Sequence, residues 1–383
     1  MNAPAPVYVD NNATTPLAPE VLAAMTACLA ECYGNPSSLH RIGAAAKQMV
    51  MDARSKVAAL LGASPAEIVF TSSATESNHL AILGALGRDR SRRHVVTTAV
   101  EHPSTRLLLA QLANQGVSVS EIAVDGDGLP DLAALEAAIT PHTALVSMMW
   151  ANNETGAILP VAEAAAMAAS HGVVFHTDAV QAVGRVPVDM RHVPADLLSL
   201  SGHKLHAAKG IGVLFMRKGC KLPPLLWGHQ ERGRRGGTEN VAAIVGLGVA
   251  AELALASMEA DNAYIAALRH RLEQGLLQQL PFASVNSQGA LRLANTSNIR
   301  FGEIDAEITL DRLDKAGICA SSGSACSAGG TEPSHVLRAM GQSRTEALAA
   351  VRFSLSRYNT VLEVDRILKV LPDIVRPLAG MAA

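Results

Sequence analysis

The sequence has few aromatic residues and almost no net charge. Aromatic side chains make up only 3% of the 383 residues whereas 49% are hydrophobic, so a core must be built mainly from Ala, Leu, Val and Ile. The formal net charge of -2 gives no electrostatic reason to expect binding to nucleic acid or to an anionic membrane. The chain is long enough to bury a large core and is too long for a single domain.

The cysteines are odd in number and scattered, at Cys28, Cys32, Cys220, Cys319 and Cys326. This pattern argues against a disulfide framework and favours a reducing compartment. Cys28 and Cys32 lie four residues apart on an expected helix, but no second pair is near to complete a metal site, so we expect them to pack in the core. We see no basic-then-apolar leader and no uninterrupted apolar run of spanning length, so we expect a cytoplasmic protein without membrane contact.

Short apolar runs alternate with helical patterns through the first two thirds of the chain. We expect helices at 19–31 and 41–61, and strands at 67–71, 94–100, 144–150, 173–177, 197–200 and 211–216. Strands that alternate with helices are typical of parallel crossovers, and continuous apolar strands are typical of a sheet covered on both faces. The prediction is a three-layer α/β domain with a mainly parallel sheet.

The pattern changes after Gly246, where 247–280 reads as one or two long helices and only two later strands, 298–301 and 351–356, are evident. We therefore predict a large domain over 16–256. Residues 1–15 and 257–383 should form a smaller α+β domain that carries a loop at about 320–332.

Lys204 lies in the stretch DLLSLSGHKLHAAKGIG, between two apolar runs that we expect to be buried strands. An unpaired ammonium there would be costly, and a buried lysine is a candidate amine nucleophile or Schiff-base former. The alternative is a lysine that extends from the loop to solvent. This stretch alone does not decide between them.

Polar residues follow the other expected strands. Ligands of an open α/β sheet bind outside the carboxyl ends of its strands. Small residues at Ser72 to Thr75 open a helix and form a potential phosphate site, while His102, Asn153, Asp178 and Gln181 follow later strands. A single histidine is more often structural, and Asp178 alone could cap a helix. Together with Lys204, however, the set matches the needs of pyridoxal phosphate: a lysine, an acidic partner for the ring nitrogen and phosphate donors.

Ten motifs from Tyr8 to Tyr358 resemble those of the cysteine desulfurase family, of the NifS/IscS type. They are YVDNNATT, GNPSSLH, FTSSATES, EHP, WANNETG, FHTDAVQAVG, LSLSGHKLHAAKG, GHQERGRRGGTEN, ASSGSAC and RFSLSRY. The resemblance implies a pyridoxal 5'-phosphate enzyme of fold type I. Such an enzyme takes sulfur from L-cysteine, leaves L-alanine and holds the sulfur as a persulfide. It also implies a homodimer and an iron–sulfur scaffold as the sulfur acceptor. The motif sequences are most similar to the NifS branch, which implies nitrogenase-type clusters.

The resemblance also assigns roles residue by residue. Lys204 is similar to the lysine that carries the cofactor and moves the substrate proton, Asp178 to the partner of the ring nitrogen, and His102 to a stacking residue and acid/base. The implied cofactor-binding residues are Ala74, Thr75, His102, Asn153, Asp178, Gln181, Ser201, Gly202, His203, Lys204 and Thr238. Thr238 resembles a threonine that reaches the phosphate of the partner subunit.

Arg352 lies in VRFSLSRY, where alternation puts Val351 and Phe353 on one strand face and Arg352 on the other. An arginine on a polar strand face can clamp a carboxylate with two hydrogen bonds, and the resemblance implies that it binds the substrate, together with Asn153 and Asn35. The alternative is an ordinary salt bridge. Arg357 falls on the apolar face and is expected to be structural.

Cys326 lies in SSGSACSAGGTE, a run of small residues with almost nothing to pack, which we expect to be mobile. The resemblance implies that its thiol is the nucleophile that takes the sulfur, and that its persulfide meets cluster iron transiently during transfer. Cys319 fits a structural role better.

Two other functions remain open. A selenocysteine lyase or an aminotransferase could share the fold, although an aminotransferase would not need Cys326. A non-catalytic sulfur-transfer scaffold is the alternative from a different class, although a degenerate site would be expected to lose some of these residues. One departure from related sequences is Trp227, in PLLWGHQERG, where a longer glycine string is usual.

Overall fold

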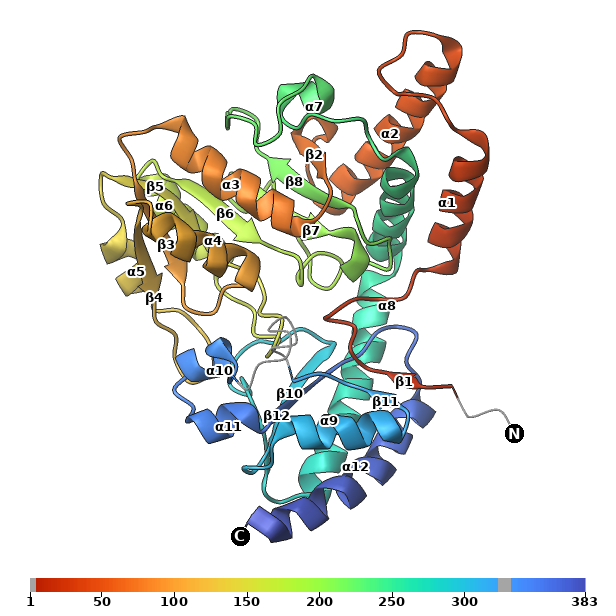
Figure 1. Cartoon of the computed structure of the whole chain (residues 1–383), viewed down its shortest axis with the longest axis vertical. Coiled ribbons are helices and arrows are strands. Elements are labelled where there is room, and N and C mark those ends of the chain that lie inside the picture. The colour runs from red at the N-terminus through yellow and green to blue at the C-terminus, as the bar shows by residue number, and fades with distance from the viewer. Residues whose placement is uncertain (1–4, 323–331, 383) are drawn as a thin grey trace.

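The computed structural model describes residues 5–322 and 332–382, and its largest element is a seven-stranded sheet. The strands are β2 (Ile68–Thr71), β3 (His94–Thr98), β4 (Ser118–Ile122), β5 (Thr143–Ser147), β6 (Val174–Asp178), β7 (Leu197–Ser201) and β8 (Gly212–Met216). Their order is β2-β8-β7-β6-β5-β3-β4, and only β8 is antiparallel to its neighbours. The predicted α/β class and mainly parallel sheet are confirmed (Figure 1).

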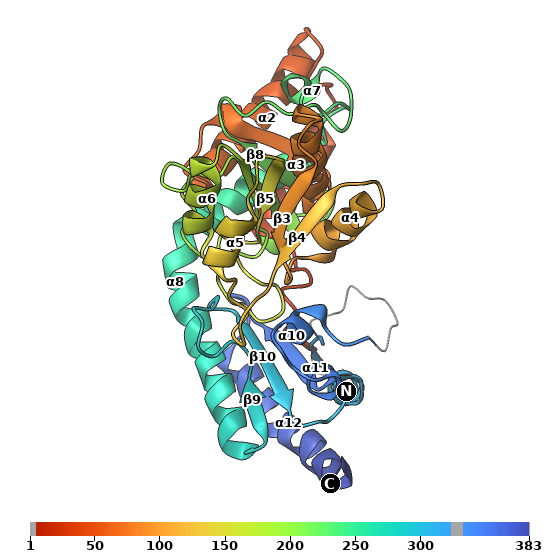
Figure 2. The ribbon, with the colours of Figure 1, turned by 90° about the vertical axis from the view of Figure 1, so that its left-hand side faces the viewer.

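Helices cover both faces of this sheet (Figure 2). They are α1 (Pro19–Glu31), α2 (Arg41–Leu60), α3 (Ala74–Arg88), α4 (Pro103–Ala113), α5 (Leu132–Ala138), α6 (Val161–Ser170), α7 (Gln230–Gly233) and α8 (Val241–Gln279), with short 3₁₀ turns at η1 (Pro65–Glu67) and η2 (Gly202–Lys204). Successive strand residues serve opposite faces. Leu198 packs with the core under α2, α6 and α8, whereas Leu197 packs with the core under α3 and α4. Both faces of the sheet are buried under helices, which explains why its strands are rich in apolar residues.

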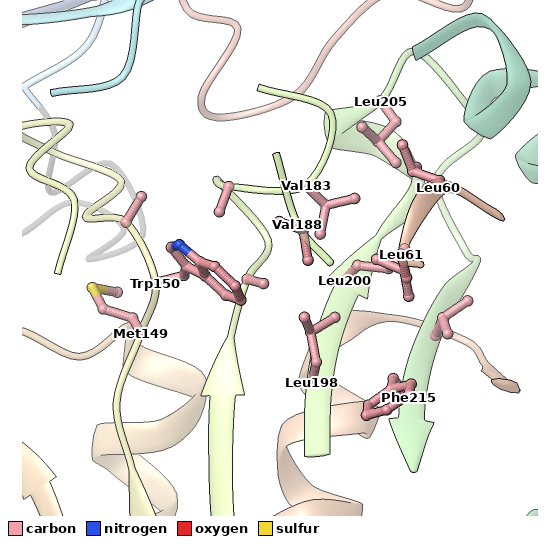
Figure 3. Close-up of a cluster of buried hydrophobic side chains, with 14 of the residues drawn as sticks. Leu60, Leu61, Met149, Trp150, Val183, Val188, Leu198, Leu200, Leu205 and Phe215 are labelled. Atoms are coloured by element: carbon pink, nitrogen blue, oxygen red, sulfur yellow. The ribbon is translucent and has the colours of Figure 1, made fainter. Parts of the chain in front are cut away.

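Figure 3 shows the first of these cores, where Leu198 and Leu200 of β7 face Phe215 of β8 and Leu61, which follows α2. Leu61 and Phe215 have no exposed surface, and Leu200 has almost none. This packing fixes the position of β7, whose carboxyl end leads directly into Lys204.

A second core gathers Val7 and Val9 with side chains from 265–375. Around it lie β1 (Val7–Tyr8), β9 (Ala283–Val285), β10 (Thr296–Phe301), β11 (Ile318–Cys319), β12 (Ala350–Ser354), α9 (Ala306–Lys315), α10 (His335–Ala339), α11 (Arg344–Leu348) and α12 (Val361–Ala382). The order β12-β10-β9 forms an antiparallel sheet, and β1 pairs with β11 in parallel. Val351 and Phe353 face this core, as the alternation predicted.

The helix α8 contributes to both cores, with Val241–Ala254 in the first and 265–276 in the second. The domain boundary predicted after 256 therefore falls inside one continuous helix. Among the described residues, α8 is long and apolar enough to cross a membrane, by length and composition alone. From the sequence we expected no apolar run of this length. Half of its most apolar stretch is buried in the protein, where it packs against α1 and α2.

Candidate active site

A cavity of about 330 Å³ lies at the carboxyl ends of β5, β6 and β7. The residues that line it come from both cores and include most of those predicted from the sequence. They are Asn12, Ala13, Ser73, Ala74, Thr75, His102, Ser104, Met149, Ala151, Asn153, Asp178, Val180, Gln181, Ser201, His203, Lys204 and Arg352. The edge of the parallel sheet thus gathers the side chains that the strand-end argument placed together.

Lys204 occupies the short turn η2 directly after β7. Its Nζ donates to the carbonyl oxygen of Ala13 at 2.7 Å and to that of Asn12. The side chain is half-buried and is directed into the cavity toward the amino-terminal segment, not outward to solvent. This geometry favours the amine-nucleophile reading of the sequence over the solvent-exposed one.

Asp178 closes β6 and is only 5% exposed. Its Oδ1 accepts a hydrogen bond from the backbone N–H of Val180 at 3.1 Å, and its Oδ2 accepts one from Nδ2 of Asn78 at 2.7 Å. Both oxygens are therefore held in fixed directions while the carboxylate faces the cavity. An oriented carboxylate of this kind suits the protonated ring nitrogen of a pyridine.

His102 is the N-cap of α4, where its Nδ1 accepts the backbone N–H of Ser104 at 3.2 Å. Its Nδ1 also lies 2.8 Å from the hydroxyl oxygen of Ser104. Burial lowers the pKa of His102, the carboxylate of Asp178 opposes this shift, and the ammonium of Lys204 adds to it. The ring is therefore uncharged at neutral pH.

Gln181 is fixed from two sides. Its Nε2 donates to the carbonyl oxygen of Asn12 at 3.1 Å, and its Oε1 accepts from Nη1 of Arg185. Asn12 also donates from Nδ2 to the carbonyl oxygen of Asn153 at 3.0 Å. Asn12 is a site residue that our sequence reasoning missed, although it lies in the motif YVDNNATT, and that motif was the available signal.

The start of α3 forms the potential anion site. Ser73 caps the helix by accepting the N–H of Glu76 at 3.2 Å, and Ala74 and Thr75 line the cavity. A Cβ at Gly212 would lie 2.6 Å from the carbonyl carbon of Ser73, so only glycine lets β8 approach the helix start this closely. Ser201 and His203 line the same cavity as this helix start, and a helix N-terminus favours an anion such as phosphate.

Arg352 reaches the cavity from β12 and is 2% exposed. Its Nη2 pairs with Oδ1 of Asp10 at 2.7 Å, and its Nη1 donates to the carbonyl oxygen of Asn153 at 3.0 Å. The salt bridge that we considered as an alternative is thus present, at a residue that also faces the cavity. Arg357 pairs with Asp261 at 3.2 Å and does not line this cavity.

Three of the predicted site residues that the structure describes do not line this cavity. Gly202 is packed beneath it, because a Cβ there would lie 2.7 Å from Ile211 Cγ2. Thr238 lines a separate cavity of about 180 Å³. Asn35 lies between α1 and α2, where its Oδ1 accepts the N–H of Ser37 at 2.9 Å. Cys326 falls outside the described residues, so its assignments as nucleophile and as iron contact stay predictions.

The residues that flank the segment of Cys326 are described, and both contact elements of the site. The N–H of Arg352 donates to the carbonyl oxygen of Ser321 at 2.6 Å. The hydroxyl of Ser334 donates to Oε2 of Glu154 at 2.5 Å, next to Asn153. The two ends of the segment therefore start and finish close to the cavity.

His176 and Cys28 have packing roles outside the site. His176 is fully buried, with Nδ1 at 2.9 Å from the hydroxyl of Ser147 and Nε2 at 2.9 Å from that of Ser199. Burial lowers the pKa of His176 to about 4, so it is a neutral structural histidine. Cys28 lies in the first core, as the cysteine spacing led us to expect.

The donor set of the cavity fits pyridoxal phosphate. It combines an amine on Lys204, an oriented carboxylate on Asp178, a flat imidazole on His102 and a helix start open to phosphate. The sequence model of the family described as "Aminotransferase class-V" matches residues 7–367. The chain belongs to this family. Its members use pyridoxal phosphate, which is the cofactor of this site.

Curated relatives align over nearly the whole chain. A "Cysteine desulfurase" from Gluconacetobacter diazotrophicus is 52% identical and aligns over 100% of this chain and 96% of its own length. "Cysteine desulfurase NifS" from Azotobacter vinelandii is 50% identical over 99% of this chain and 94% of its own length.

Solved structures with similar folds include proteins related to NifS. One titled "NIFS-LIKE PROTEIN" superposes with a TM-score of 0.91 at 37% identity, covering 97% of this chain and 100% of that one. Another, titled "SspA in complex with cysteine", has a TM-score of 0.79 at 34% identity and covers 92% of this chain and 100% of that one. The predicted resemblance and fold type are confirmed.

Proposed function

We propose that this protein is a cysteine desulfurase, which converts L-cysteine to L-alanine and holds the released sulfur as a persulfide on Cys326. The relatives named above support the reaction class, because they share about half of their residues with this chain over nearly full length. The single structural observation that carries the proposal is the convergence of Lys204, Asp178, His102 and Arg352 on one cavity. That set provides both cofactor binding and recognition of an amino-acid carboxylate.

Pyridoxal phosphate supplies an electron sink when it is bound, and Lys204 is the residue that holds it. Asp178 would hold a proton at the ring nitrogen, and His102 would lie against the ring. Arg352 binds the substrate carboxylate, while Lys204 moves the proton at Cα of the substrate.

The thiolate of Cys326 attacks the substrate sulfur. A sulfur–sulfur bond forms, the carbon–sulfur bond breaks, and its electron pair stays on substrate Cβ, which takes up a proton to give alanine. The ends of the segment that carries Cys326 lie near the cavity, as this step requires.

The deciding experiment is sulfide release from L-cysteine with a thiol reductant, on wild type and on Cys326→Ala, with the visible cofactor band recorded for both. Cys319→Ala is the matched control, because Cys319 lies in β11 with its side chain half-buried. We expect Cys326→Ala to keep the band and lose sulfide release, and Cys319→Ala to keep both. If Cys326→Ala releases sulfide normally, a lyase or aminotransferase reaction replaces the proposal. If wild type binds no cofactor, the scaffold function replaces it.

We further propose a homodimer. Asn35 and Thr238 were assigned to the site but lie apart from the cavity in their own chain, so a second copy could supply them. Large apolar side chains are exposed at the same end of the molecule, around α1, α2 and the segment before α7 (Figure 1). They are Leu22, Leu29, Tyr33, Leu39, Leu225, Leu226 and Trp227. An apolar surface of this kind is typical of a subunit interface.

The acceptor we propose is an iron–sulfur scaffold of the nitrogenase type, supported by the 50% identity to the relative named NifS. We also propose a reducing, cytoplasmic location, supported by free thiols at Cys28, Cys32, Cys220 and Cys319. Purification of the tagged protein with cross-linking to its partners tests the acceptor: recovery of a cluster scaffold supports it, and recovery of a tRNA-modifying enzyme in its place contradicts it.

A further inference from the structure

Asn78 is a buried amide that connects two residues of the active site. It lies on α3, has no exposed surface and lines no described cavity. Its Nδ2 donates one hydrogen to Oδ2 of Asp178 at 2.7 Å and the other to the hydroxyl oxygen of Ser104 at 2.9 Å. The opposite orientation of the amide would place its oxygen against the carboxylate, so the direction of both bonds is fixed.

Ser104 continues the connection to His102. The hydroxyl oxygen of Ser104 accepts from Asn78 and lies 2.8 Å from Nδ1 of His102, and the backbone N–H of Ser104 donates to the same Nδ1 at 3.2 Å. A backbone N–H can only donate, so Nδ1 presents its lone pair and the ring proton lies on Nε2. Because Nδ1 carries no proton, the hydroxyl of Ser104 is the donor in its contact with that nitrogen.

We propose that Asn78 and Ser104 are positioning residues that hold His102 in its neutral Nε2–H tautomer and fix its ring relative to Asp178. The inference rests on the proposed function, because that function assigns both Asp178 and His102 to the cofactor. A ring held in this way can stack and donate a hydrogen bond from Nε2. It cannot accept a proton at Nδ1 without losing the bonds from Ser104, so proton transfer at the substrate falls to Lys204.

Burial and Lys204 both favour the uncharged form of His102, and Asp178 opposes them. Burial has the largest effect on the pKa of His102 and lowers it; Lys204 lowers it further, and only Asp178 raises it. His203 and His335 are the other titratable groups that interact with the ring, and burial lowers the pKa of both, which keeps them uncharged.

The test is ¹⁵N NMR of the full-length protein labelled at histidine, without and with pyridoxal phosphate. The His102 signals are identified by their loss in His102→Gln. Ser104→Ala removes the hydroxyl, and Asn78→Leu removes the amide that orients it. Thr105→Val is the matched control: it also removes a buried hydroxyl on α4, one that has no partner within the described residues.

In wild type we expect Nδ1 without a proton and Nε2 with one. Loss of one hydrogen bond to Nδ1 should raise the pKa of His102 and mix the two tautomers, because the lone pair on Nδ1 is then less strongly engaged. We expect this in Ser104→Ala and in Asn78→Leu, recovery of the wild-type signals in Ser104→Thr, and no change in Thr105→Val.

A protonated Nδ1 in wild type at neutral pH would overturn the proposal, as would wild-type signals in Ser104→Ala. If only Asn78→Leu retains wild-type signals, Asn78 has no part in the connection. Should Asn78→Leu not fold, Ser104→Ala still decides the tautomer. The NMR signals report the tautomer without catalysis, whereas sulfide release tests the proposed function. Measuring sulfide release separately on wild type therefore distinguishes failure of this inference from failure of the proposed function.

Discussion

The guanidinium of Arg352, which lines the active-site cavity, pairs with Asp10, with 2.7 Å between Nη2 and Oδ1. The pair joins β12 to the amino-terminal segment and holds the guanidinium still before substrate arrives. Nη1 donates to the carbonyl oxygen of Asn153 at 3.0 Å, so the guanidinium is oriented by neighbouring residues. A fixed guanidinium loses little conformational entropy when it binds a carboxylate.

We expect Arg352→Gln to raise KM for L-cysteine and to lower kcat/KM about 50-fold, because a charge-assisted pair with the substrate carboxylate is lost. The measurement is steady-state sulfide release over a range of L-cysteine concentrations. Arg357→Gln is the matched control, since Arg357 pairs with Asp261 away from the cavity. An unchanged KM in Arg352→Gln would show that the arginine serves only the salt bridge with Asp10.

Lys204 is expected to determine cofactor retention. Lys204→Ala should fold but lose the visible cofactor band on gel filtration, and the apoprotein should bind pyridoxal phosphate at least about tenfold more weakly, because the covalent link is gone. Lys209→Ala is the control: Lys209 is exposed in the same loop and lines no described cavity with Lys204. Equal affinities of Lys204→Ala and wild type would exclude Lys204 as the attachment site.

The proposed dimer can be tested at its apolar end. Trp227 is 82% exposed, and Trp227→Glu should shift the protein toward monomer in sedimentation equilibrium, because a charge would be buried at the interface. Leu362→Glu is the control, since Leu362 is 80% exposed at the start of α12, a helix of the second core. A monomeric wild type that still turns over would contradict the proposal and the partner role of Thr238.

The sheet and most of the cavity could be predicted because their signals are local. Strands β2, β5, β6, β7 and β8 each contain adjacent apolar residues, and the polar site residues of β6 and β7 follow them directly in the sequence. Strand β4 escaped prediction because it is an edge strand with exposed Ser118 and Glu121. Helix α12 escaped because Pro372 and Pro377 interrupt its helical pattern.

The remaining contacts depend on long-range packing and leave no local pattern. The carbonyl oxygen of Asn12 receives Lys204 and Gln181 across more than 160 residues of sequence. Asp10 meets Arg352 across 342 residues, and Asn78 meets Asp178 across 100. The motifs around these residues could be read as resemblance, but which atoms they contact is set by how the two cores pack together.

Glu101 is a buried acid next to His102 that makes stability depend on pH. Its Oε1 accepts the hydroxyl of Thr98 at 2.6 Å and the N–H of Met149 at 2.9 Å. Its Oε2 is buried without a partner within the described residues. Burial raises the pKa of Glu101 from 4.5 to about 8, and the two hydrogen bonds only partly offset this.

The folded protein therefore binds more protons at Glu101 than the unfolded chain does between pH 4.5 and about 8. The free energy of unfolding should fall as pH rises through this window, by about 5 kcal/mol from this residue. Glu101→Gln retains the acceptor for Thr98 and Met149 but cannot ionise, so we expect it to lack this loss and to be more stable than wild type above pH 8. Urea unfolding at a series of pH values measures the difference, with the exposed Glu121→Gln as control. Parallel pH profiles for Glu101→Gln and wild type would show that Glu101 is already ionised in the folded protein, and that the cavity wall behind His102 is more polar than its burial indicates.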